Sequence, residues 1–241
     1  MSLEGYARAI RFRLVRPGSR VPGRSWVGAV RDLRRWGLDV ERWNTVLPES
    51  DEAWVPTLTD LGAVPKMSTF AIGAVVARGV REMPPDAAYL NIGVWHGYTL
   101  LSGMAAGPDR TCVGVDDFSE YGGPEAAFRG RFAALATESH RFHSMDFRRY
   151  LAEVHQGPVG LYYYDGPNSY EDELDGLRMA EPFLVEGSWI LLDDTNWEGR
   201  RRAFQDFVAS SPNRWEVVFD QRTAYNKHLT FWNGLTILKR R

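Results

Sequence analysis

Aspartates follow two apolar runs in the second half of the chain, and their positions suggest a shared site. Asp165 ends the run VGLYYYD, and Asp193 and Asp194 end the run SWILLDD. Short apolar runs that alternate with helical patterns predict a parallel sheet, and the carboxyl ends of its strands lie at one edge. Carboxylate oxygens are the ligands that Mg²⁺ prefers. We therefore expect Asp165, Asp193 and Asp194 to be metal ligands, with Asp165 also a catalytic and a cofactor-binding residue. The alternative is that Asp165 contacts a cofactor, Asp193 or Asp194 caps the following helix, and no metal binds.

An earlier strand pattern runs directly into a helical one at YLNIGVWHGYTLL, with glycines four residues apart at Gly93 and Gly97. Glycine at such a turn lets a ligand approach the backbone, and the free amides of a helix start favour a carboxylate. Tyr98 and Thr99 would add hydroxyl donors there. The spacing is not the G-x-G-x-x-G of dinucleotide enzymes, which weakens a nicotinamide interpretation. Two such glycines are equally compatible with a simple tight turn.

Two further aspartates end the next strand-like runs and would complete a nucleoside site. The run TCVGVDD ends in Asp116 and Asp117, where a carboxylate can accept hydrogen bonds from both ribose hydroxyls, and we favour Asp116. The run RFHSMDF presents Asp146, which could accept from an adenine amine. A role for Asp146 as the N-cap of the following helix is equally compatible with the sequence.

The elements that must position these residues predict an α/β fold with one main core. Five strand-like runs alternate with helical segments between Ala87 and Asp194, and RWEVVFDQRTAYN and HLTFWNGLTILKR predict an antiparallel C-terminal hairpin. MSTFAIGAVVARGVREM predicts the amphipathic helix that precedes the sheet, ended by Pro84. Residues 1–65, rich in Arg, Trp and Pro and with a helical pattern at VGAVRDLRRWGL, predict a helical cap or substrate lid. The expected domains are therefore 1–65 and 66–241.

The segments YLNIGVWHGYTLL, CVGVDDF, LYYYDGPNSYEDEL and WILLDDTN resemble, in order and spacing, successive motifs of class I S-adenosylmethionine-dependent methyltransferases. The likeness runs from about Lys66 to the C-terminus. It is closest to small bacterial O-methyltransferases of the macrolide-sugar type and more distant to catechol O-methyltransferase. It implies a Rossmann-like, mostly parallel seven-stranded sheet, S-adenosylmethionine across the ends of the first strands, and a substrate held by the cap. Metal-dependent relatives bind their ion through positions that correspond to Asp165, Asp193 and Asp194.

Two asparagines depart from the pattern of those relatives. Asn91 occupies a position that is usually acidic and lies near the amino-acid part of the cofactor, so we include it among the cofactor-binding residues. Asn168 occupies a position where relatives carry a lysine or histidine that resembles a general base. An amide cannot remove a proton near neutral pH, so Asn168 is a catalytic position without a base. Either a metal ion alone ionises the acceptor, or the base comes from elsewhere, with four unplaced candidates: His96, His143, Tyr170 and His228.

The resulting hypothesis is metal-assisted O-methylation of a small-molecule hydroxyl, of the sugar or natural-product type, with S-adenosylmethionine and Mg²⁺. The alternatives are a metal-independent methyltransferase and a non-catalytic cofactor-binding module of the same fold. A net charge of −2 argues against a nucleic-acid partner, and no apolar stretch approaches the ~20 residues that span a bilayer. With Cys112 as the one cysteine and no signal-like start, we expect a cytoplasmic protein with no membrane partner. The sequence leaves a homo-oligomer open.

Overall fold

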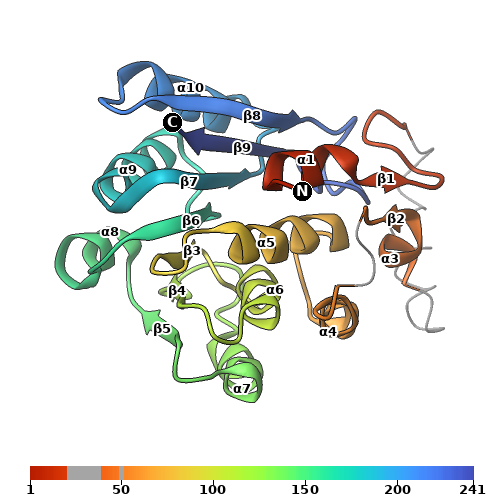
Figure 1. Ribbon diagram of the computed structural model, residues 1–241, viewed down its shortest axis with the longest axis horizontal. Coiled ribbons are helices and arrows are strands. Elements are labelled where there is room, and N and C mark those ends of the chain that lie inside the picture. Colours follow the sequence, from red (N-terminus) through yellow and green to blue (C-terminus); the bar gives the residue numbers. More distant parts are fainter. Residues whose placement is uncertain (21–38, 49–51) are drawn as a thin grey trace.

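A seven-stranded sheet forms the centre of the protein (Figure 1). The computed structural model describes residues 1–20, 39–48 and 52–241. The strands run in the spatial order β5-β4-β3-β6-β7-β9-β8. Neighbours from β5 to β7 pair in parallel, and β9 pairs antiparallel with both β7 and β8. This confirms the predicted fold class, a mostly parallel sheet with an antiparallel C-terminal hairpin. The strands are β3 (Ala88–Ile92), β4 (Cys112–Asp116), β5 (His140–Ser144), β6 (Val159–Tyr164), β7 (Leu184–Asp193), β8 (Trp215–Gln221) and β9 (Leu235–Arg240).

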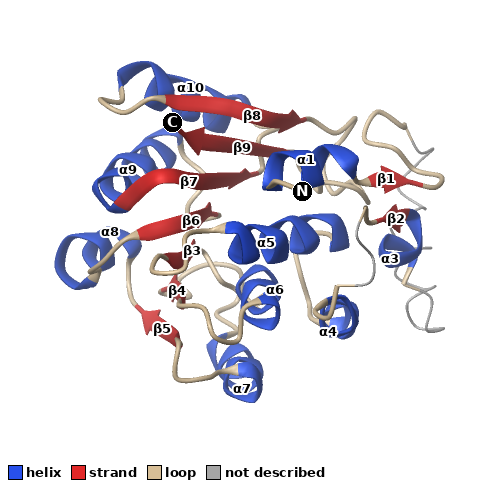
Figure 2. Ribbon diagram, in the orientation of Figure 1, coloured by secondary structure: helices blue, strands red, loops and turns tan. Residues whose placement is uncertain are grey.

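Helices cover both faces of the sheet, as the apolar strand sequences require (Figure 2). Successive side chains of β3 alternate between two cores: Tyr89 belongs to the core under α5 and α6, and Leu90 to the core under α9 and α10. The helices that follow the first N-terminal segment are α5 (Phe70–Glu82), α6 (Tyr98–Ala106), α7 (Glu125–Leu135), α8 (Phe147–Arg149), α9 (Tyr170–Ala180) and α10 (Glu198–Ser210). A short π-helix (Tyr150–Val154) and a 3₁₀ turn (Glu181–Phe183) follow α8 and α9.

The N-terminal segment is partly built into the main core. Helix α1 (Leu3–Ala9) contacts α5 and β8, and its buried Leu3 and Tyr6 belong to the same apolar cluster as α5. Figure 1 shows α1 alongside α5, with the other N-terminal elements at the end of the molecule where β6 and β7 finish. These are β1 (Arg11–Phe12), α3 (Val40–Asn44), β2 (Thr45–Val46), α4 (Val55–Asp60) and a 3₁₀ turn (Leu61–Ala63). The helix expected at VGAVRDLRRWGL lies outside the described residues.

The C-terminal hairpin is shorter than its sequence pattern predicts. Of the run HLTFWNGLTILKR, only Leu235–Arg240 forms a strand, because the chain turns at Gly234, whose φ of 96° is left-handed. The Asn233-Gly234 pair therefore forms a bend before the strand. The Asn233 side chain holds the preceding loop by accepting from the Lys227 amide (2.7 Å) and donating to Asp194 (2.5 Å). Residues 222–234 thus form a loop that packs against the end of β7.

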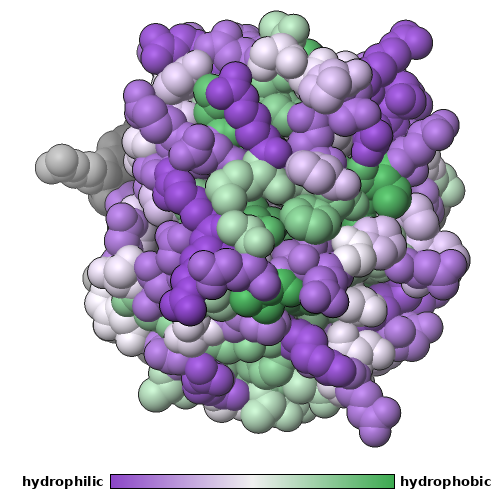
Figure 3. Space-filling model, turned by 90° about the vertical axis from the view of Figure 1, so that its left-hand side faces the viewer, coloured by the Kyte–Doolittle hydropathy of each residue, from purple (hydrophilic) through white to green (hydrophobic). Residues whose placement is uncertain are grey.

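The face at which β6 and β7 begin is predominantly hydrophilic, with apolar residues in limited patches (Figure 3). In the described part of the chain, no helix combines the length and the apolar character needed to cross a bilayer.

Candidate active site

A cavity of about 320 Å³ opens at the carboxyl ends of β3, β4 and β6, where the strand order reverses. This is the position at which open α/β sheets bind ligands, and the volume falls within the range of about 300–1,000 Å³ for small-molecule sites. Two groups of residues line it. The first follows β3, β4 and β5 and comprises Gly93–Thr99, Asp116–Tyr121 and Met145–Phe147; the second comprises Pro65–Ser68, Asp165–Asn168, Asp194, Trp197, Lys227, Trp232 and Asn233.

The turn between β3 and α6 requires both of its glycines. Gly93 has a φ of 79°, and a Cβ at this position would overlap the carbonyl oxygen of Asp165. Gly97 has a φ of 99° and is the N-cap of α6. Among the described side chains none caps the start of this helix, so its first amide groups remain available at the cavity. Both glycines therefore line the cavity, where the sequence analysis expected a ligand. Tyr98 and Thr99 also line it, but both side chains are more than nine-tenths buried.

Asn91 does not line the cavity, which differs from its predicted cofactor contact. It is fully buried, and its Oδ1 accepts from the Thr99 hydroxyl (2.8 Å) and the Tyr89 hydroxyl (3.1 Å). Its Nδ2 donates to the carbonyl oxygens of Gly93 (2.9 Å) and Ile92 (3.2 Å). The Asn91 side chain therefore forms all of its hydrogen bonds with β3, the turn and the start of α6. Asn91 fixes the turn from below, and the Thr99 hydroxyl points toward Asn91.

Asp116 ties the ends of β3 and β4 together at the cavity wall. One carboxylate oxygen accepts from the amides of Val94 and Trp95, both at 2.7 Å, and the other from the amide of Phe118 at 2.7 Å. Asp117 is exposed and accepts from the Ser119 amide (2.9 Å) through one oxygen. Both aspartates line the cavity, and each keeps lone pairs for a ligand.

Asp146 lies at the same wall, between Met145 and Phe147. Its Oδ1 accepts from the Arg149 amide at 3.0 Å, so it is the N-cap of α8. The alternative that the sequence left open is therefore realised, and the second carboxylate oxygen has no protein partner in the described hydrogen bonds.

The three aspartates at the opposite wall lie close enough to interact electrostatically, but they differ in exposure. The Asp165 side chain is 30% exposed and lines the cavity together with Asp194, whereas Asp193 is 1% exposed and does not. Burial, followed by the charges of Asp193 and Asp194, raises the pKa of Asp165 well above its usual range. Burial and Asp194 likewise raise the pKa of Asp193 to about 8.

The residues present do not fit the predicted three-carboxylate metal site. Asp193 does not line the cavity, and each of its oxygens already accepts a hydrogen bond, one from the Tyr163 hydroxyl (2.7 Å) and the other from the Asp194 amide (2.8 Å). Asp194 has a left-handed φ of 60°, and its Oδ1 accepts from Asn233. Across residues 1–20, 39–48 and 52–241, no three Asp, Glu, His or Cys side chains are arranged to hold a metal ion.

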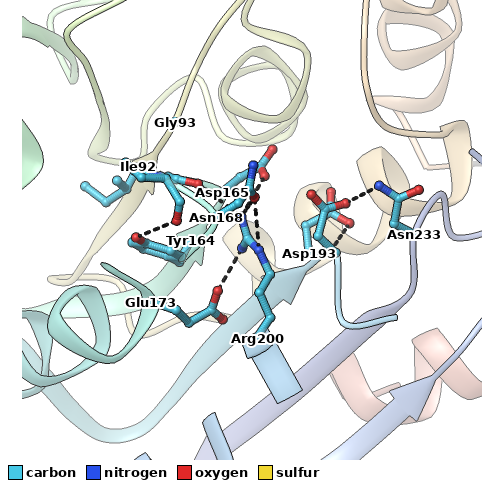
Figure 4. A network of polar contacts seen from close by, with 12 residues as sticks. Ile92, Gly93, Tyr164, Asp165, Asn168, Glu173, Asp193, Arg200 and Asn233 are labelled. Atoms are coloured by element: carbon cyan, nitrogen blue, oxygen red, sulfur yellow. Dashed lines mark hydrogen bonds and ion pairs between the residues drawn. The ribbon is translucent and has the colours of Figure 1, made fainter. Parts of the chain in front are cut away.

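The cation beside Asp165 is the guanidinium of Arg200, which is fully buried (Figure 4). It pairs with Glu173 at 2.8 Å and lies 3.9 Å from Asp165. It also donates to the Gly166 carbonyl (3.0 Å) and twice to Asn168 Oδ1, at 3.1 Å through Nε and at a shorter distance through Nη2. Asn168 in turn donates to the Tyr121 hydroxyl (3.0 Å) at the mouth of the cavity. Asn168 is thus at the site, with its amide orientation set by Arg200.

Of the four unplaced base candidates, His96 lines the cavity. Burial and Arg131 lower its pKa, and Arg131 lies 3.1 Å from Nδ1. Since a guanidinium only donates, Nδ1 accepts and the proton of the neutral ring sits on Nε2, which makes His96 a donor.

The other three candidates do not line the cavity. Tyr170, at the start of α9, donates to Asp206 of α10 (2.7 Å), and His228 is buried with Nδ1 2.8 Å from the Thr230 hydroxyl. His143 packs against the Tyr150 ring at 4.8 Å. None of these three is placed to receive a proton from a substrate in the cavity.

Sequence reasoning missed several residues that line the cavity. Ser68 is 5% exposed, and its hydroxyl has no hydrogen-bond partner among the described residues. Tyr121 is 57% exposed, and its backbone carbonyl accepts from the Trp95 indole (3.0 Å) across the cavity mouth. Lys227 and Trp232 reach the cavity from the C-terminal loop, both with left-handed φ values. A positive φ at a residue other than glycine cannot be recognised from the sequence. The sequence pattern therefore could not predict that these two residues reach the cavity.

Part of the chain that carries these residues matches a known protein family. Residues 90–195 match the family described as "Methyltransferase domain". This segment contains the turn at Gly93, Asp116, Asp146 and the Asp165–Asp194 wall. No curated protein matches the chain in sequence.

Solved structures share the whole architecture at low sequence identity. The calicheamicin methyltransferase CalS11 has a TM-score of 0.58 at 18% identity, over 91% of this chain and 94% of that one. A methyltransferase from Podospora anserina, PaMTH1, crystallised with S-adenosylhomocysteine, has a TM-score of 0.57 at 16% identity, over 93% and 99%. Cofactor-bound Rv0187 from MTB has a TM-score of 0.57 at 16% identity, over 91% and 98%.

Residues 90–195 are therefore similar to a methyltransferase domain, and the sheet that carries them has the fold of the class I methyltransferases.

Proposed function

We propose that this enzyme methylates a hydroxyl group of a small molecule, and that Asp165 accepts the proton. The observation that carries the proposal is the two-sided cavity. One wall is the glycine turn and the aspartates that follow β4 and β5, and the facing wall carries Asp165 with its raised pKa. A carboxylate with a raised pKa is a stronger base than an ordinary one, which suits it to a hydroxyl that loses its proton as it reacts.

The first wall fits S-adenosylmethionine on features of this chain. The uncapped amides at the start of α6 favour the cofactor carboxylate, and the lack of a Cβ at Gly93 lets the Asp165 backbone pack against this turn. The buried Ser68 hydroxyl is a further polar group at the cavity. Asp116 or Asp117 would accept from the ribose hydroxyls, and the second oxygen of Asp146 from the adenine amine. Asn91 acts through the turn that it holds.

S-adenosylmethionine, when bound, supplies an electrophilic methyl group and leaves as S-adenosylhomocysteine. The chain must therefore hold the acceptor hydroxyl in line with that methyl group and receive its proton. Asp165 receives the proton as the new oxygen–carbon bond forms, and the bonding pair of the broken carbon–sulfur bond stays on sulfur. Asn168 and the Tyr121 hydroxyl form a polar rim beside Asp165, and Trp197 and Trp232 supply flat apolar surface for the body of the acceptor.

We propose an acceptor of the sugar or natural-product type. Support comes from two structural neighbours. CalS11 is described as a TDP-rhamnose 3'-O-methyltransferase of calicheamicin biosynthesis, and NovP as an O-methyltransferase. The exposed Lys227 at the cavity would suit an acidic group on such an acceptor.

The test is calorimetric titration with S-adenosylmethionine and S-adenosylhomocysteine, followed by methyl-transfer assays with a panel of hydroxylated acceptors that includes TDP-sugars. Asp165→Asn should retain S-adenosylhomocysteine affinity and lose about 100-fold or more in kcat. Wild-type kcat should rise with pH through an ionisation above the usual carboxyl range. If Asp165→Asn turns over as fast as wild type, Asp165 is not the base. If wild type does not bind the cofactor, the proposal is wrong altogether.

The sequence led us to expect magnesium assistance, but the arrangement of the three carboxylates does not fit the ion, and the proposed mechanism has no step that uses it. The same assays after chelation of divalent ions, and again after addition of Mg²⁺, test this point directly.

A further inference from the structure

Arg200 has the largest of the fully buried side chains among the described residues, and complete burial is unusual for an arginine. It projects from the first turn of α10 into the space between the ends of β6 and β7 (Figure 4). Arginine is rarely removed from water unless it is paired, because desolvation of the charge is unfavourable. Here burial opposes the charge, but Glu173, Asp165 and Asp194 together raise the pKa of Arg200 above its usual value. The side chain is therefore a permanent positive charge inside the site.

The guanidinium binds the turn after β6 through its fork. Gly166 and Asn168 accept three hydrogen bonds from its Nε and Nη2 groups, while Nη1 is paired with Glu173 of α9. A planar donor with fixed geometry holds such a turn more specifically than an ammonium group would. Arg200 thus connects α10, α9 and the segment that carries Asp165.

The same charge lies where it disfavours a divalent ion. Arg200 Nη2 is 3.9 Å from Asp165 Oδ1, so a metal ion bound to that carboxylate would face a like charge across a short distance. Asp193, the expected second ligand, is buried away from the cavity and already accepts from the Tyr163 hydroxyl and the Asp194 amide. Both features act in the same direction, and both belong to the protein itself.

We propose that Arg200 is a resident cation of this site, a positioning residue that balances the charge of Asp165 and fixes its turn in place of a divalent metal ion. The methyl-transfer consequence, activity without a metal ion, rests on the proposed function. The cation assignment itself does not, and it can be tested without any acceptor.

In the experiment, metal-stripped protein is titrated with Mn²⁺. Binding is measured by calorimetry and by the electron paramagnetic resonance signal of the free Mn²⁺. Wild type should bind Mn²⁺ weakly. Arg200→Met should bind it at least about tenfold more tightly, because Asp165 and Glu173 lose their counter-charge. Arg200→Lys keeps the charge and should bind as weakly as wild type. A purely structural arginine would not produce this difference between Met and Lys.

Arg201→Met is the matched control. Arg201 is the next residue, and its guanidinium pairs with Asp220 at 2.6 Å outside the cavity. Its loss should leave Mn²⁺ binding unchanged.

Two results overturn the inference: tight Mn²⁺ binding by wild type that is lost in Asp165→Asn, or an Arg200→Met protein that binds no more tightly than wild type. If Arg200→Met does not fold, the wild-type and Asp165→Asn titrations still decide. A parallel titration with S-adenosylmethionine separates the two proposals. Absence of cofactor binding with weak Mn²⁺ binding rejects the proposed function alone, whereas cofactor binding with Mn²⁺ held at Asp165 rejects this inference alone.

Discussion

Asp193 should make the protein less stable as pH rises, and Asp193→Asn should remove that dependence. Burial, with the neighbouring Asp194, raises the pKa of Asp193 from its ordinary 3.8 to about 8, although the Tyr163 hydroxyl bond opposes the shift. Between these two values the folded protein holds a proton that the unfolded chain has released. The stabilisation is therefore complete below the unfolded pKa and is lost as pH rises through the folded one.

The slope from one such group is at most about 1.4 kcal/mol per pH unit, so between pH 5 and pH 7 the free energy of unfolding should fall by up to about 2.7 kcal/mol. For a chain of this size that corresponds to roughly 5–10 °C in Tm. Asparagine is nearly isosteric and does not titrate, and its amide can donate to the Tyr163 hydroxyl in return. The variant should therefore match wild type near pH 5 and be the more stable protein near pH 8.

Urea unfolding at about pH 5, 6, 7 and 8, compared between wild type and Asp193→Asn, isolates this residue. The difference is needed because burial also raises the pKa of Glu173, to about 7, and adds a slope of the same sign. Asp220→Asn is the control: Arg201 lowers the pKa of Asp220, so its contribution is constant above the usual carboxyl range. Wild-type and Asp193→Asn curves that remain parallel across this range would refute the reasoning.

Three further predictions concern the cofactor wall. Gly93→Ala should weaken S-adenosylhomocysteine binding at least about tenfold by calorimetry, because the new Cβ would overlap the Asp165 carbonyl. The control is Gly122→Ala, which is also at positive φ but has nothing within 4 Å of its Cβ, and it should retain the wild-type affinity. Equal losses of affinity in the two variants would contradict this explanation. Asn91→Leu should lower the free energy of unfolding by about 1–3 kcal/mol by stranding buried donors and acceptors, and an unchanged urea midpoint would count against it. Asp116→Ala should weaken S-adenosylhomocysteine binding and speed hydrogen exchange at the two amides it holds after β3, whereas unchanged exchange would show that the turn holds itself.

The sheet could be predicted from the sequence because its signal is local. Strand runs such as CVGVD and VGLYYY are buried on both faces and read as continuous apolar segments, and the glycine turn follows β3 in sequence. To locate the cavity from the predicted strands, one needs in addition only the rule that ligands bind where the strand order reverses. Asp165 and Asp194 could be placed at one edge for the same reason.

Contacts between distant segments could not be predicted in this way. Lys227 and Trp232 reach the cavity because Asn233 bridges a C-terminal loop to Asp194, 39 positions away. The fate of Asp193 depends on the Tyr163 hydroxyl of the adjacent strand, which points to the same face only in the observed register. Residue types told us that carboxylates meet here, but not which of their oxygens the protein itself uses.

Asn168 and Arg200 are best understood together. At position 168 the sequence departs from relatives with a lysine or histidine, and without the structure this reads as the loss of a base. In the structure the Asn168 oxygen is an acceptor for a buried guanidinium, with the Arg200 Nε bond at 3.1 Å. A lysine in this place would bring a second cation against Arg200, and a protonated histidine would do the same, whereas a neutral amide oxygen satisfies it. An asparagine at position 168 is therefore compatible with an arginine at position 200, and under the mechanism that we propose Asp165 accepts the proton.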